Sequence, residues 1–203
     1  NFKNNKKLTK VVTKFFLFIF YCIIFNASIA ETKNILVSTA NPLASETGRN
    51  ILLKGGNAID AAVAIQLILN LVEPQSSGIG GGGFLMYYDN KNKNITFYDG
   101  RETAPSKIKK KHFLDKNGEP LSFYKGAIGG LSIGVPGLIS MLELAHQNHG
   151  IVEWEILFKP AINLAENGFA ISPRLYNAIK KDQYLYFFPR SKEYFYEKNK
   201  IYK

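Results

Sequence analysis

The sequence predicts a fold that mixes α-helices and β-strands, with helices flanking a short strand pair. Five segments carry apolar residues at helical spacing, and two short apolar runs joined by a polar turn are typical of a β-hairpin. Of the 203 residues, 46% are hydrophobic and 21% are charged, which argues against wholesale disorder, collagen-like repetition and a coiled-coil rod. This length suits one domain with a sizeable core.

Two helices are predicted near the start of this domain. After an extended stretch at Ile35–Val37, the first begins at Asn41-Pro42 and ends at Gly55-Gly56. Asn57 caps the second, Ala58–Val72, which is apolar almost all round. It is too short to span a bilayer, so we expect a buried core helix.

The predicted strands are Phe84–Tyr88 and Ile95–Tyr98, joined by the turn at residues 89–94. A long, mostly irregular loop follows from Gly100 to Gly134, with a turn signal at residues 116–118. The remaining predicted helices are Gly137–His149, Glu153–Asn167 and Pro173 to about Asp182.

Residues 1–30 are typical of a secretory signal peptide. Five lysines precede the apolar run Phe15–Phe25, and Ser28 and Ala30 stand at the spacing that a signal peptidase recognises. The eleven-residue run is shorter than a membrane span, although an uncleaved anchor is the alternative interpretation. We therefore expect a mature chain of residues 31–203 in the periplasm or outside the cell.

Charge and cysteine content narrow the possible partners. The net charge is +10, but the five lysines of the first 30 residues leave only +5 for residues 31–203, so a nucleic-acid partner is not indicated. The sole cysteine, Cys22, would leave with the signal, and with it any thiolate metal site. The first residue is Asn1 instead of Met, and we expect the chain to be a piece of a longer protein.

Residues 184–203 interleave aromatic with basic side chains. This pattern occurs in single-stranded nucleic-acid binding. For an exported chain we favour the alternative of a helical region whose partner surface lies in sequence outside this chain.

The segment Pro74–Phe84 contains five glycines, four of them consecutive. Such a run lets the backbone approach a ligand or another chain closely. It is not a phosphate-binding loop, because no Gly-Lys-Ser/Thr follows and it leads into a strand. Two interpretations stay open: a wall of a substrate site, or a tight turn into a core strand.

Arg101 directly follows the second predicted strand and is one of four arginines, against 22 lysines. Only arginine offers a planar, permanently charged fork for a carboxylate, so Arg101 is a candidate substrate-binding residue. The alternative is an internal salt bridge to Asp99 or Glu102.

Other catalytic patterns are weak. His146 and His149 could share a metal, but histidines are ordinary at a helix end and no carboxylate accompanies them, and His112 is expected to be solvated. We predict no metal, no cofactor and no catalytic nucleophile in this chain.

Several blocks resemble the start of the large subunit of gamma-glutamyltransferases. They cover about residues 35–183 in family order: Asn41–Ala64 with its Gly55-Gly56-Asn57-Ala58-Ile59-Asp60-Ala61-Ala62-Val63-Ala64, then Pro74–Phe84, Arg101-Glu102-Thr103-Ala104-Pro105, Gly134-Val135-Pro136-Gly137 and Glu166-Asn167-Gly168-Phe169. The resemblance implies an N-terminal-nucleophile hydrolase with an αββα sandwich, made as a precursor that cuts itself into a large and a small subunit.

The resemblance also implies the chemistry. The N-terminal Thr of the small subunit attacks the γ-glutamyl carbonyl of glutathione or a related donor, and the group passes to an amino acid, a peptide or water. Arg101 matches the family arginine that binds the donor's α-carboxylate. The nucleophilic Thr and the small subunit are absent from this sequence, so we expect the chain alone to be inactive. Its sandwich should be incomplete, with apolar faces such as that of Ile59–Val72 partly uncovered.

Two other hypotheses remain. A related N-terminal-nucleophile acylase, similar to cephalosporin acylases, would share the fold and the processing. The alternative that is not an enzyme is a periplasmic binding or interaction module that ends near Lys203.

We predict that signal peptidase cleaves this chain after Ala30 when it is expressed in a bacterial host. N-terminal sequencing of the exported protein should give Glu31-Thr32-Lys33. An exported form that keeps the lysine-rich tail would contradict this prediction.

Overall fold

The computed structural model describes residues 35–202, so the predicted signal peptide lies outside the described residues. All the described helices and strands belong to one unit, Leu36–Lys203. None of the helices in the described range is both long and apolar enough to cross a membrane.

The first described helix, α2 (Pro42–Leu53), has clear sequence signals at both ends. Its N-cap residue, Asn41, accepts a hydrogen bond from the backbone N–H of Leu43, and proline occupies the first helical position. The helix gives way to Gly55, whose φ of +97° is a left-handed conformation that favours glycine. The predicted helix is confirmed at both ends.

Helix α3 (Ala58–Val72) begins with a capping box. The Asn57 side chain accepts from the N–H groups of Ile59 and Asp60, and Asp60 Oδ2 accepts from the Asn57 N–H at 2.8 Å. Asp60 is fully buried, and its Oδ1 also accepts from the N–H of Ile151 at 3.1 Å. One carboxylate therefore joins the start of α3 to a connection 91 residues further along the chain.

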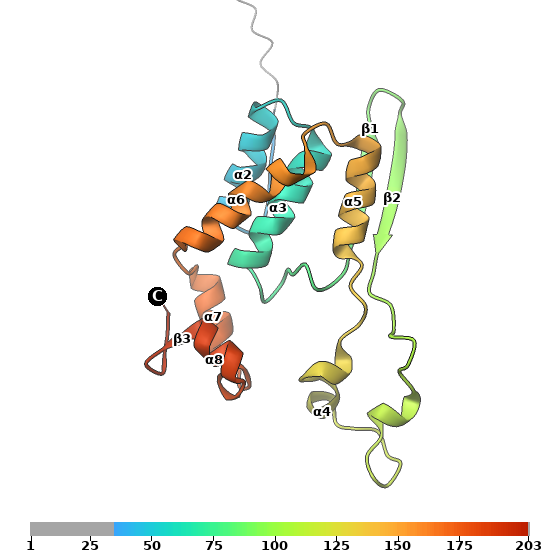
Figure 1. Ribbon diagram of the computed structural model, residues 1–203, viewed down its shortest axis with the longest axis vertical. Coiled ribbons are helices and arrows are strands. Elements are labelled where there is room, and N and C mark those ends of the chain that lie inside the picture. Colours follow the sequence, from blue (N-terminus) through green and yellow to red (C-terminus); the bar gives the residue numbers. More distant parts are fainter. Residues whose placement is uncertain (1–34, 203) are drawn as a thin grey trace, which may run out of the picture. The chain divides into compact units, whose positions relative to one another are not determined.

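Three helices surround α3: α2, α5 (Leu138–His149) and α6 (Trp154–Asn167) (Figure 1). The buried apolar residues of α3 are Ile59, Ala61, Val63, Ala64, Leu67, Ile68 and Val72. The prediction of a core helix is confirmed. Ile65, Leu69 and Leu71 of the same helix are only partly buried, which agrees with the expectation that part of its cover is missing.

The strand pair is an antiparallel hairpin of β1 (Gly83–Asp89) and β2 (Asn94–Gly100), in which Gly83 lies opposite Gly100. Each strand is slightly longer than predicted. In the turn, the side-chain amide of Asn92 and the backbone N–H of Lys91 hydrogen-bond to Asp89 and hold the pKa of its carboxyl below the ordinary value.

The two faces of the hairpin differ in their cover. One face packs on α5 and the core through Leu85, Tyr87 and Tyr98. The opposite face is also apolar but exposed: Phe84, Met86, Tyr88, Ile95 and Phe97 are each more than half accessible to solvent. Strands that are apolar on both faces are typical of a sheet inside a layered fold.

The loop between β2 and α5 is mostly irregular, as predicted. It contains only short elements: η1 (Lys110–Phe113), α4 (Phe123–Ala127) and η2 (Gly130–Ser132). Near its two ends, Thr103 and Val135 form an antiparallel bridge, with the Val135 N–H donating to Thr103 O at 2.8 Å. The bridge closes the loop on itself beside the end of β2.

After α6 the chain forms α7 (Pro173–Lys181), η3 (Leu185–Phe187) and α8 (Pro189–Phe195), then a small hairpin. Its strands are β3 (Tyr196–Glu197) and β4 (Lys200–Ile201). The expected helical region near the end of the chain is thus a helix plus a hairpin, which sequence patterning did not resolve. In contrast, the stretch Ile35–Val37, predicted as extended, belongs to no regular element.

We predict that Asp60→Ala destabilises the fold by about 2–3 kcal/mol, because the backbone N–H groups of Asn57 and Ile151 lose their buried acceptor. The matched control is Glu143→Ala, at an exposed position in the interior of α5, which should change stability by less than about 0.5 kcal/mol. Urea unfolding can be followed by the fluorescence of Trp154, the only tryptophan. Equal midpoints for the two variants would contradict the structural role of Asp60.

Candidate functional site

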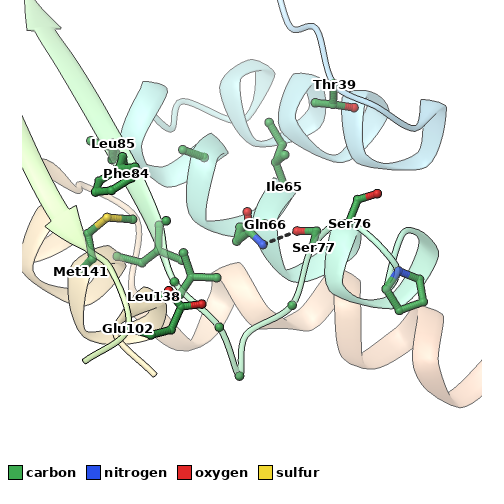
Figure 2. A pocket seen from close by; sticks show the side chains of 18 of the residues that line it. Thr39, Ile65, Gln66, Ser76, Ser77, Phe84, Leu85, Glu102, Leu138 and Met141 are labelled. Carbon is green, nitrogen blue, oxygen red and sulfur yellow. Dashed lines mark hydrogen bonds between the residues drawn. The ribbon is translucent and has the colours of Figure 1, made fainter. Parts of the chain in front are cut away.

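A cavity of about 740 Å³ lies among α3, β1, α5 and the Gly-rich loop (Figure 2). The two serines at positions 76 and 77 and the five glycines of the loop form one wall of it. Apolar side chains from the helices, including Ile65, Leu138 and Met141, and the carboxylate of Glu102 line the rest. The Gly-rich segment is therefore both a wall of a cavity and a turn into a strand.

Side chains of α3 hold the middle of this loop. Gln66 Nε2 donates to Ser77 Oγ at 2.6 Å, the interaction that Figure 2 marks with a dashed line. One turn further along the helix, Asn70 Oδ1 accepts from the backbone N–H of Ile79 at 3.0 Å. These two polar residues of a mostly apolar helix therefore shape the wall of the cavity.

The far end of the loop joins the start of α5. The carbonyl oxygen of Gly81 accepts from the N–H groups of Gly137 and Leu138, both at 3.2 Å. The first N–H groups of a helix have no partner inside the helix, so the loop supplies one here.

Three glycines let three backbones meet at this point. A Cβ on Gly82 would lie 2.5 Å from Glu102 Oε2 and 2.6 Å from the carbonyl oxygen of Gly100. A Cβ on Gly137 would also lie 2.6 Å from that carbonyl oxygen. Close approach, not a left-handed backbone conformation, is what requires glycine at these positions.

Arg101 follows the last residue of β2, as predicted. Its side chain is 71% exposed, and its Nε lies 3.4 Å from Glu102 Oε2. Its backbone N–H donates to Asp99 Oδ1 at 2.9 Å, which fixes the turn out of the strand. The salt-bridge partner is thus Glu102, and the guanidinium stays accessible to a ligand.

Arg101 lines a second cavity of about 400 Å³, formed by residues 101–105 and the returning end of the loop around Ile133. Glu102 lines both cavities. The sequence predicts Glu102 only as a possible salt-bridge partner of Arg101. Its position next to that arginine is the one sequence feature that indicates a place in the site. The structure places its carboxylate between the Gly-rich loop and the arginine.

The histidines belong to the framework. His149 Nε2 lies 2.8 Å from the hydroxyl oxygen of Tyr98, and His146 Nε2 lies 2.8 Å from the carbonyl oxygen of Val152. His112 is exposed, as expected. Residues 35–202 contain no group of three or more His, Cys, Asp or Glu side chains that could hold a metal ion.

Comparison with known proteins agrees with this architecture. The family model described as Gamma-glutamyltranspeptidase matches residues 44–203. The chain is 50% identical over 151 residues to the glutathione hydrolase proenzyme of Bacillus subtilis (strain 168), which is 74% of this chain and 26% of that protein. It is 37% identical over 150 residues to the corresponding proenzyme of Escherichia coli (strain K12), again 74% of this chain and 26% of that protein.

Among solved structures, the gamma-glutamyltranspeptidase of Helicobacter pylori matches with a TM-score of 0.79 and 41% sequence identity, over 86% of this chain and 50% of that chain. The helices and the hairpin with its strand-end arginine are thus part of an N-terminal-nucleophile hydrolase fold. The chain belongs to the gamma-glutamyltranspeptidase family. It spans about a quarter of the length of the curated relatives that it matches.

We predict that Gly82→Ala disrupts the junction between the Gly-rich loop, β2 and α5, because the new methyl group meets a backbone oxygen that cannot move aside. Gly80→Ala is the matched control, because a Cβ there meets nothing within 4 Å. Thermal unfolding of the two variants should show a loss of several degrees for Gly82→Ala only. Comparable losses for both variants would contradict the close-approach explanation.

Proposed function

We propose that the protein to which this chain contributes transfers the γ-glutamyl group of glutathione-type donors to an amino acid, a peptide or water. The observation that carries the proposal is Arg101, an accessible guanidinium that follows a strand end and lines the 400 Å³ cavity. The chain that holds it is 50% identical over 151 residues to a glutathione hydrolase proenzyme. In the proposal, this guanidinium binds the α-carboxylate of the donor through two parallel N–H···O bonds.

The covalent step needs a second polypeptide part, a small subunit cut from the same precursor. In the proposed reaction, the hydroxyl oxygen of its N-terminal Thr attacks the γ-carbonyl carbon, while the α-amine of that Thr accepts the proton. The C–N bond breaks and the leaving amine takes the proton. The resulting ester is then cleaved by the amine of an acceptor or by water, which restores the Thr hydroxyl.

The uncovered apolar face of the β1–β2 hairpin supports the need for this second part. It comprises five large apolar side chains, and such a surface is normally covered in a soluble protein. Residues 31–203 alone supply the arginine and the walls of the cavities but no nucleophile, so we propose that they are inactive by themselves. We further propose that a signal peptide at residues 1–30 directs the protein to the periplasm or the exterior.

The alternative of a cephalosporin acylase is supported by fold alone. The cephalosporin acylase from Bacillus halodurans matches with a TM-score of 0.59 at 24% identity. No feature of the described residues favours that substrate over a γ-glutamyl donor.

We predict that Arg101→Lys in the complete protein weakens donor use and that Arg101→Ala weakens it further. Lysine keeps the charge but loses the planar fork, whereas alanine leaves the carboxylate of the bound donor without its partner. The loss for alanine should be about 2 kcal/mol or more, or roughly 30-fold in kcat/KM. Self-cleavage should continue, because the bond that is cut presents no free α-carboxylate.

The measurement pairs a gel assay of precursor processing with kcat/KM for a γ-glutamyl anilide. Arg49→Ala, at an exposed position on α2, is the matched control and should leave both unchanged. Unchanged donor kinetics in Arg101→Ala would reduce Arg101 to a surface salt bridge, and loss of processing as well would point to a folding defect.

A further inference from the structure

The start of the Gly-rich loop is fixed by a buried carboxylate. Glu73, directly after α3, is 1% exposed. Its Oε1 accepts from Asn41 Nδ2 at 3.0 Å, and its Oε2 accepts from Gln75 Nε2 at 2.6 Å and from Arg174 Nη1 at 2.7 Å. A buried charge of this kind is stable only when hydrogen bonds and an opposite charge compensate it.

Arg174 reaches this carboxylate from the first turn of α7, 101 residues away in sequence. Its second terminal nitrogen, Nη2, donates to Ser76 Oγ at 3.0 Å. The guanidinium therefore uses both ends of its fork, one on Glu73 and one on the loop itself, which a lysine ammonium cannot reproduce. Arg174 is one of only four arginines in the chain.

Glu73 also holds the part of the loop where the wall of the cavity begins. The carbonyl oxygen of Glu73 accepts from the N–H groups of Ser76 and Ser77, both at 2.9 Å, and these two serines line the 740 Å³ cavity. Further along, the loop carries Gly82, against which the Glu102 carboxylate packs. The guanidinium of Arg174 thus holds the Gly-rich loop at Ser76, where the wall begins. At its other end, near Gly82, the same wall contacts Glu102.

We propose that Glu73 and Arg174 are positioning residues for the donor site: α7, through this pair, holds the Gly-rich loop in the shape that binds the γ-glutamyl donor. The pair itself does not touch the donor. This inference rests on the proposed function, and it adds α7 to the elements that determine donor affinity. Because the nucleophile comes from another part of the protein, a displaced wall should weaken binding more than it slows the chemical step.

The test uses the complete protein with Arg174→Ala, Arg174→Lys and Glu73→Gln. Arg190→Ala is the matched control, because Arg190 pairs with Glu193 on α8 where both side chains are largely exposed. Steady-state kinetics with a γ-glutamyl anilide are measured beside hydrogen exchange of the peptide at residues 74–83. The thermal unfolding of every variant is recorded.

For Arg174→Ala we expect KM to rise about tenfold, the equivalent of one charge-assisted hydrogen bond, with kcat within about twofold of the parent. Exchange at residues 74–83 should accelerate about tenfold. Arg174→Lys should recover part of both effects, Glu73→Gln should resemble Arg174→Ala in direction, and Arg190→Ala should match the parent. A variant that fails to fold is replaced by Arg174→Lys, which keeps the charge opposite Glu73.

Two results would overturn the inference. An unchanged KM with a lowered unfolding temperature would make the pair a stabilising contact only, and unchanged exchange in the loop would show that α7 does not hold it. If the parent itself turns over no γ-glutamyl donor, the proposed function fails and the donor role of the pair fails with it. The exchange measurement would still decide separately whether α7 holds the loop.

Discussion

The packing of α3 at the centre of the helices is the constraint on which the other features depend. An apolar helix can be buried only if its ends are satisfied and its polar side chains have partners. Asp60 satisfies the first condition by bonding its own helix start and the α5–α6 connection. Gln66 and Asn70 satisfy the second by bonding the Gly-rich loop. The core and the cavity wall thus share one helix.

The candidate site is built on α3 through the Gly-rich loop, which leaves that helix and contacts both α5 and β2. The loop that leaves α3 is held by Glu73 at its start and by the first N–H groups of α5 at its end. Between these points it can pass β2 closely only because glycine occupies positions 82, 100 and 137. Arg101 directly follows Gly100, the last residue of β2, so its position depends on the same junction. The side chain of Arg101 is largely exposed, yet close backbone contacts at this junction determine its position.

The exposed face of the hairpin is a surface that further polypeptide would cover in the complete family fold, of which this chain covers half of one solved example. The five apolar side chains on that face alternate along the strands with residues that face the core, such as Leu85, Tyr87 and Tyr98, as the strand period of two requires. The sequence around Phe84 and Phe97 is therefore suited to a sheet covered on both sides. In the proposed complete protein, the remaining polypeptide supplies the second cover together with the nucleophile.

Local signals determined much of this protein from its sequence alone. Caps such as Asn57, stop signals such as Gly55, and apolar spacing located the major helices and the hairpin, because each signal acts within a few residues. The strand-end position of Arg101 was determined in the same way. Only the tertiary structure decided that three helices cover α3, that Glu102 lies between two cavities, and that Arg174 bonds Glu73. These contacts join residues far apart in the chain, and no local pattern encodes which distant partner a buried side chain meets.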